Sequence, residues 1–189
     1  MINKFCTTLL LSGLSFSLYA ADNYRIDSRH TFPSFEINHL GFSTQRGRFN
    51  QTTGTVVIDT KSKTGGSIEV SIDSASIDTG LAELETHLRG DDFLAAAKFK
   101  TIDFKSTQLQ FTGEQLIGVE GNLHLHGISK PVHLTIDAFH CGMNLIKLVA
   151  TCGANATTTI KRSDFGVDKY VPMIGDEVKI SIQIEAIKE

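Results

Sequence analysis

Residues 117–137, IGVEGNLHLHGISKPVHLTID, decide the fold class of this chain. Apolar side chains recur at every second position from Ile117 to Leu125, except at Gly121, and again from Val132 to Ile136. A period of two gives a β-strand one apolar and one polar face. The intervening HGISKP is rich in turn-forming residues. The stretch therefore predicts an antiparallel hairpin whose dry face has to be covered by more protein or by an apolar ligand.

The same alternation continues along most of the chain, with clear examples at residues 35–39, 68–72 and 178–186. Roughly eight to ten short strands joined by short turns predict an all-β, antiparallel fold. Two closed folds suit such a chain, a sandwich and an up-and-down barrel. Because consecutive strands are linked by hairpin-length turns, the pattern favours a lipocalin-like barrel of about eight strands. A barrel of about eight strands encloses either packed side chains or one small ligand, and the pattern alone leaves both open.

One segment departs from the strand pattern. Leucines at positions 81, 84 and 88 have helical spacing, so we expect a short helical excursion near residues 79–89. Asp78 or Thr79 would cap its start, and Gly90 would end it.

Residues 1–20 are different in kind from the rest of the chain. They contain one lysine, then an uncharged apolar run, and they end in small residues. This order is typical of a secretory signal peptide, with cleavage after Ala20 or Ala21. Residues 22–189 then form a single domain, and the expected location is the periplasm.

Charge and known motifs exclude several functions. The formal net charge is −3 and no run of Lys or Arg occurs, which argues against nucleic acid as a partner. The sequence also lacks the GxSxG, P-loop and GxGxxG motifs of hydrolases and nucleotide-binding enzymes. We therefore expect a protein that is not an enzyme and that carries no cofactor.

Two cysteines, Cys141 and Cys152, remain after signal cleavage. An isolated pair in an oxidising compartment is most simply a disulfide, worth about 3 kcal/mol on the chain-entropy model. A redox or metal pair is the alternative, although the CxxC spacing is absent.

Five segments occur in an order and spacing that are specific together. They are YRIDSRHTFPSFEINHLGFSTQRGRF (24–49), ETHLRGDDFLAAAKFKTIDFKS (85–106), GVEGNLHLHGISKPVHL (118–134), CGANATTTIKRSDFGVDKY (152–170) and GDEVKISIQIEA (175–186). Through them the chain resembles the YceI-like family of exported lipid-binding proteins.

The resemblance implies an eight-stranded lipocalin-like barrel, mostly periplasmic in bacteria, that encloses a polyisoprenoid, a fatty-acyl chain or another long-chain lipid. A carrier or sequestering role follows, with peripheral contact to a membrane or a lipid donor. The oligomeric state stays open, a homodimer included.

Apolar side chains on alternating strand faces, taken with the resemblance, give candidates for the lining of the lumen. These are Phe35, Ile37, His39, Phe49, Phe104, Phe111, Leu123, Leu125, Leu134 and Ile136. Family positions also give three candidate contacts for a polar head group: His30, Arg89 and Arg162. For any single Phe, an ordinary place in a packed core is the competing interpretation.

A metal site is the alternative function. His124 and His126 share one strand face, and His133 would join them if Leu125 paired with Val132 or close to that register. Three histidines with a water or a fourth ligand suit zinc. The competing interpretation is the polar, solvent-facing side of an antiparallel sheet.

Overall fold

The structure is a computed structural model that describes residues 21–59 and 65–189. The predicted signal peptide at 1–20 lies outside the described residues. The strands are β1 (Asp22–Ile26), β2 (Phe32–His39), β3 (Ser43–Phe49), β4 (Thr52–Ile58), β5 (Gly66–Asp73), β6 (Ile77–Asp78), β7 (Thr101–Thr112), β8 (Gln115–Leu125), β9 (Ile128–Asn144), β10 (Val149–Lys161) and β11 (Ile174–Lys188). The helical elements are α1 (Ala82–Leu88), η1 (Ser74–Ser76) and η2 (Arg162–Phe165).

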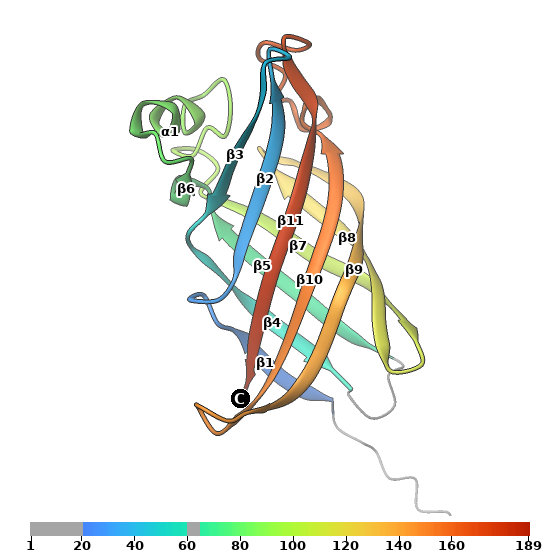
Figure 1. Cartoon of the computed structure of the whole chain (residues 1–189). Helices are drawn as coiled ribbons and strands as arrows, with labels where there is room; N and C mark the ends of the chain where they lie inside the picture. The colour runs from blue at the N-terminus through green and yellow to red at the C-terminus, as the bar shows by residue number, and fades with distance from the viewer. Residues whose placement is uncertain (1–20, 60–64) are drawn as a thin grey trace, which may run out of the picture.

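Eight of these strands close into an antiparallel barrel (Figure 1). The order is β1-β4-β5-β7-β8-β9-β10-β11, and β1 returns to pair with the C-terminal part of β11. The predicted eight-stranded barrel is therefore confirmed. The N-terminal part of β11 pairs instead with β2, which leads on to β3 and β6. One end of the molecule is thus a closed ring, and the other is widened by the β2–β3–β6 extension.

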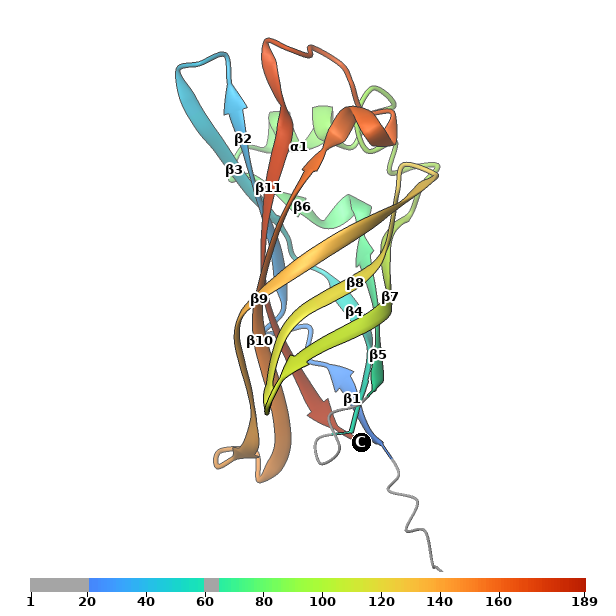
Figure 2. The ribbon, with the colours of Figure 1, turned by 90° about the vertical axis from the view of Figure 1, so that its right-hand side faces the viewer.

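The chain between β6 and β7 covers the side of the widened end (Figure 2). It contains α1, which begins later than predicted: the N-cap is Leu81, and it makes no side-chain cap hydrogen bond. Instead, the backbone N–H of Thr79 donates to the Glu85 carboxylate at 3.0 Å. Leu81 is exposed. In the described part of the chain, no helix is long and apolar enough to cross a membrane.

The β8–β9 hairpin has a shorter turn than the sequence suggested. Its two central residues are His126 and Gly127, with φ angles of 52° and 79°. Leu125 pairs with Ile128, and Val132 pairs with Gly121, so the register that the three-histidine metal site required is not formed. Two positive φ angles are what a type I′ turn requires, and such turns usually carry Asn-Gly or Asp-Gly. Histidine in the first position concealed the turn.

The end of the barrel opposite the widened end, which we call the closed end, is filled by side chains. Tyr24, Ile26, Val56 and Ile58 from β1 and β4 are buried there together with Cys152 and Ala186. Cys141 and Cys152 pair directly across β9 and β10 and form the predicted disulfide. Apolar side chains thus fill this end by the usual burial of hydrophobic surface. The interior becomes hollow only toward the widened end.

Candidate functional site: an apolar cavity

A cavity of about 410 Å³ occupies the barrel interior above the packed end. Its longest wall is β11, where Ile174, Val178, Ile180, Ile182 and Ile184 all face inward. Ten residues of strand extend for about 33 Å, so the cavity is long rather than round. Its volume lies within the range of about 300–1,000 Å³ that is usual for small-molecule sites.

The cavity reaches the surface at the widened end. Its lining there includes the exposed side chains of His39, His87 and Tyr170. The rings of His87 and Tyr170 stack with centroids 6.3 Å apart, which links the α1 segment to the loop before β11. An ion pair between Lys169 and Asp92, at 3.2 Å, joins the same two segments. We call this end the mouth.

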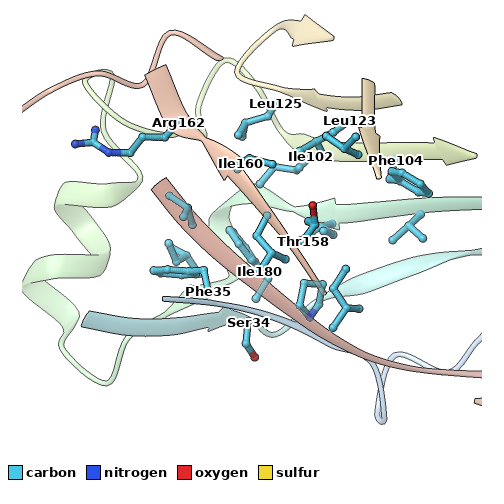
Figure 3. A pocket seen from close by; sticks show the side chains of 18 of the residues that line it. Ser34, Phe35, Ile102, Phe104, Leu123, Leu125, Thr158, Ile160, Arg162 and Ile180 are labelled. Carbon is cyan, nitrogen blue, oxygen red and sulfur yellow. The ribbon is translucent and has the colours of Figure 1, made fainter. Parts of the chain in front are cut away.

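Nine of the ten candidate lumen residues line the cavity. Figure 3 shows Phe35, Phe104, Leu123 and Leu125 directed into a common space from strands that are distant in sequence. The other five that line it are Ile37, His39, Phe49, Leu134 and Ile136.

Phe111 is the exception among the candidate lumen residues. It packs in the closed-end core, with its ring edge-on to Phe139 at 6.4 Å between centroids. Phe111 lies seven residues beyond Phe104 on β7, which is about 23 Å along a strand. It points inward as predicted, but at a level where the barrel is filled.

Two of the three candidate head-group residues lie away from the cavity. His30 donates to the carboxylate of Asp27 at 3.0 Å, in a cluster that also contains Lys147 from the β9–β10 turn. Arg89 donates to the backbone carbonyl of Ala75 at 3.3 Å. Neither side chain is part of the cavity wall.

Arg162 is the third candidate, and it does line the cavity (Figure 3). Its guanidinium is buried and donates to three backbone carbonyls, those of Val167 (2.7 Å), Gly175 (2.8 Å) and Ile174 (3.0 Å). Burial lowers the pKa of Arg162, and the nearby carboxylates of Asp176 and Asp168 act in the opposite direction. A guanidinium stays protonated all the same. Arg162 therefore holds together the two ends of the loop between η2 and β11, which forms part of the mouth.

The three histidines of the alternative metal site are not brought together. His133 lies opposite Glu120 and donates to its carboxylate at 2.7 Å. His124 lies four residues farther along β8, about 13 Å away, and His126 is in the turn, bonded to the Phe165 carbonyl. In residues 21–59 and 65–189, no group of three or more His, Cys, Asp or Glu side chains is arranged to hold a metal ion. The shorter turn is the reason, because it moves His133 away from the other two.

Sequence reasoning missed the contribution of the α1 segment to the wall. Leu84, His87, Leu88, Phe93 and Leu94 all line the cavity. The helical spacing of the leucines was the available signal, but it does not say which surface a short helix covers.

Two strand glycines give room to aromatic rings in the wall. A Cβ atom added to Gly47 would lie 2.5 Å from the ring of Phe35, and one added to Gly121 would lie 2.4 Å from that of Phe104. Each ring therefore lies close against the backbone of a neighbouring strand instead of extending across the lumen.

Comparison with known proteins identifies a family model that matches most of the chain and relatives that match its full length. A model described as the YceI-like domain matches residues 24–186. A UPF0312 protein of Pseudomonas paraeruginosa is 34% identical, with 100% of both chains covered. A UPF0312 protein of Yersinia pestis is 36% identical over 100% of this chain and 99% of the relative.

Solved structures show the same fold at lower identity. BcnA of Burkholderia cenocepacia superimposes with a TM-score of 0.71 at 23% identity, covering 85% of this chain and 98% of that one. A polyisoprenoid binding domain from Saccharophagus degradans gives a TM-score of 0.65 at 18% identity, with 88% and 98% covered.

Proposed function

The chain belongs to the YceI-like family, and from that premise we propose that its cavity holds one long apolar ligand of the polyisoprenoid or fatty-acyl type. The observation that carries the proposal is the largely apolar lining, in which Ile174 and the row from Val178 to Ile184 span about 33 Å along β11. An apolar chain is held through the area that it removes from water, at about 0.8 kcal/mol for each buried methylene. Smooth walls of Ile, Leu, Val and Phe provide that area.

The distribution of polar side chains along the wall gives the ligand a direction. His39, Gln45, His87 and Tyr170 lie at the mouth, whereas Ile136 and Ile184 lie near the closed end. The guanidinium of Arg162 is bonded to backbone carbonyls, and the other polar groups of the wall are the hydroxyls of Thr31, Ser34, Thr52 and Thr158. A lipid with a polar head would leave that group at the mouth, where water satisfies its hydrogen bonds. We therefore propose that the tail enters first and that the head remains at the surface.

The protein's role in this proposal is to carry or sequester the ligand without transforming it. The fold of the Saccharophagus degradans domain, described as polyisoprenoid binding, supports the ligand class. A periplasmic location is supported by the signal-like residues 1–20 and by the Cys141–Cys152 disulfide, which is typical of an oxidising compartment.

Native mass spectrometry of the protein purified from its own host tests the proposal. The expected spectrum contains a species heavier than the polypeptide by the mass of one lipid, and organic extraction removes the added mass. The stripped protein is expected to take up one equivalent of a fluorescent fatty acid or prenol. A protein that is isolated empty and binds neither probe would contradict the proposal.

A further inference from the structure

An exposed apolar surface surrounds part of the mouth. We call it the apolar rim and define it as Leu40, Phe42, Tyr170, Val171 and Met173. Their exposed fractions range from 36% for Val171 to 88% for Phe42. The residues come from the β2–β3 turn and from the loop before β11, which meet at the mouth end (Figures 1 and 2). The backbone N–H of Leu40 donates to the Met173 carbonyl at 3.1 Å, so the two turns form one surface.

Two rim residues have an unusual backbone conformation, which exposed Leu148 in the β9–β10 turn shares (φ 52°). Leu40 and Tyr170 have φ angles of 57° and 63°, in the left-handed region that favours glycine or asparagine. A bulky residue held there is strained, and such strain concentrates at functional positions. Large apolar side chains thus stand in water at positions where folding alone would favour small or polar ones.

The rim is also electrically neutral. No Asp, Glu, Lys or Arg occurs from Ile37 to Gln45 or from Tyr170 to Gly175. Three of the four charged residues next to these two segments are in ion pairs, Arg46 with Glu36 at 3.1 Å and Lys169 with Asp92 at 3.2 Å. The fourth, Asp176, accepts hydrogen bonds from the backbone N–H and the hydroxyl of Ser163. An apolar and uncharged surface suits the hydrocarbon boundary of a bilayer better than a charged macromolecule.

The rim is continuous with the cavity. His39 and Ile174 line the cavity and adjoin Leu40 and Met173 in the chain. We propose that the apolar rim inserts into a lipid bilayer and that the ligand passes between bilayer and cavity there, without crossing water. This inference rests on the proposed function, because it concerns how that ligand enters and leaves.

The opposite end of the molecule offers a matched control. Large apolar side chains are exposed there as well: Met143 at the end of β9, and Leu145, Ile146 and Leu148 in the β9–β10 turn, with 95% exposure for Ile146. This turn adjoins the packed closed end of the barrel, far from the mouth (Figure 1). It has the same chemistry as the rim but no continuity with the cavity.

Transfer of a fluorescent fatty acid from loaded protein to phosphatidylcholine vesicles that contain a quencher tests the inference. Three proteins are compared by stopped flow: the wild type, Phe42→Ser with Met173→Ser, and Leu145→Ser with Ile146→Ser. We expect the wild-type rate to rise in proportion to vesicle concentration and to change little with added salt. The Phe42/Met173 variant should transfer about tenfold more slowly, with unchanged equilibrium affinity, because neither side chain lines the cavity.

Other outcomes overturn the inference. A wild-type rate independent of vesicle concentration would mean transfer through water. An equally reduced transfer rate in the Leu145/Ile146 variant would mean that any exposed apolar residue promotes transfer, wherever it lies on the protein. A wild-type dimer that dissociates in the Phe42/Met173 variant, seen by light scattering, would assign the rim to a second copy of this chain. Failure of all three proteins to bind the fatty acid would overturn the proposed function and the rim's role together.

Discussion

Thr31 and Thr52 are two fully buried threonines in the wall of the cavity, and they differ in their hydrogen bonds. The Thr31 hydroxyl donates to the Glu185 carbonyl at 3.3 Å and accepts from the Glu185 N–H at 3.1 Å. Within residues 21–59 and 65–189, the Thr52 hydroxyl has no hydrogen-bond partner. A buried polar group without a partner costs about 1–3 kcal/mol.

Replacing each threonine by valine therefore has opposite expected effects. Thr52→Val should raise the free energy of unfolding by about 1 kcal/mol, because it removes an unsatisfied hydroxyl at nearly constant shape. Thr31→Val should lower it by about 1–2 kcal/mol, since it leaves the backbone N–H of Glu185 unpaired, while the Glu185 carbonyl keeps its hydrogen bond from the Asp27 N–H at 2.8 Å. Urea denaturation measures both values. A loss of stability in Thr52→Val as large as that in Thr31→Val would contradict this interpretation.

Asp27 is a buried carboxylate with a strongly shifted pKa. Its side chain is 4% exposed and accepts from Lys147 at 2.6 Å, from His30 at 3.0 Å, and from the backbone N–H and Nε of Arg29. The hydrogen bond from Lys147 is the largest cause that holds the pKa of Asp27 well below its usual range, followed by those from His30 and Arg29, against the effect of burial.

The sign of this pKa shift sets the pH dependence of stability. A depressed pKa stabilises the fold above the unfolded-state value of about 3.9, and the contribution is lost as pH falls below it. At pH 7, Asp27→Asn should lower the free energy of unfolding, because it removes the carboxylate charge that Lys147, His30 and Arg29 contact. Since these partners are partly exposed to solvent, we expect a loss of about 2 kcal/mol. The difference from wild type should shrink steadily below about pH 4. Urea titrations at several pH values measure it, with Asp137→Asn as an exposed control; a constant difference down to pH 2 would be the contrary result.

At the scale of elements, the β9–β10 hairpin is fixed at its outer end by two different devices. The disulfide joins Cys141 and Cys152, whose Cα atoms are 4.0 Å apart, and Lys147 in the turn reaches Asp27 after β1. The disulfide lies beside the closed-end core and away from the cavity. It should therefore affect stability and leave ligand binding unchanged.

Replacing both cysteines by alanine should lower the free energy of unfolding by about 3 kcal/mol, mainly through the freer unfolded chain. A thiol reductant should destabilise the wild type by a similar amount and leave the double variant unaffected. Affinity for a fluorescent fatty acid should be the same in both proteins. Equal stability with and without the disulfide would disprove this assignment.

The elements were predictable where a single period governs a segment. Period-two alternation identified the long strands, because one face of each strand is buried throughout. The β8–β9 register was not predictable, since it depends on His126 adopting a positive φ in a two-residue turn. The start of α1 was not predictable either, because Leu81 is an unusual N-cap residue without a capping side chain. The Thr79 N–H instead donates to the Glu85 carboxylate.

At the scale of the whole molecule, the barrel is packed at one end and hollow at the other. Phe104 and Phe111 both point inward from β7, yet one lines the cavity and the other fills the core. Local sequence cannot separate the two, because a lumen wall and a packed core both require apolar residues at every second position. The family resemblance supplied the expectation of a cavity, and the widening by β2, β3 and α1 shows where it lies.

Blocking the lumen is the most direct test of its role as the ligand site. Ala156 on β10 faces the cavity, and Thr159 on the same strand is exposed. Ala156→Phe places a ring in the space that the ligand needs, and Thr159→Phe adds the same ring outside as a control. Ala154→Leu, on the same wall, provides a second blocking variant if the larger ring disturbs folding.

The deciding measurement is equilibrium titration of these variants with a fluorescent fatty acid, after circular dichroism has shown that each is folded. The account predicts that Ala156→Phe and Ala154→Leu weaken binding by about tenfold or more, which is about 1.4 kcal/mol, while Thr159→Phe binds like the wild type. Wild-type affinity in a folded Ala156→Phe protein would show that the ligand binds elsewhere and would contradict the central claim.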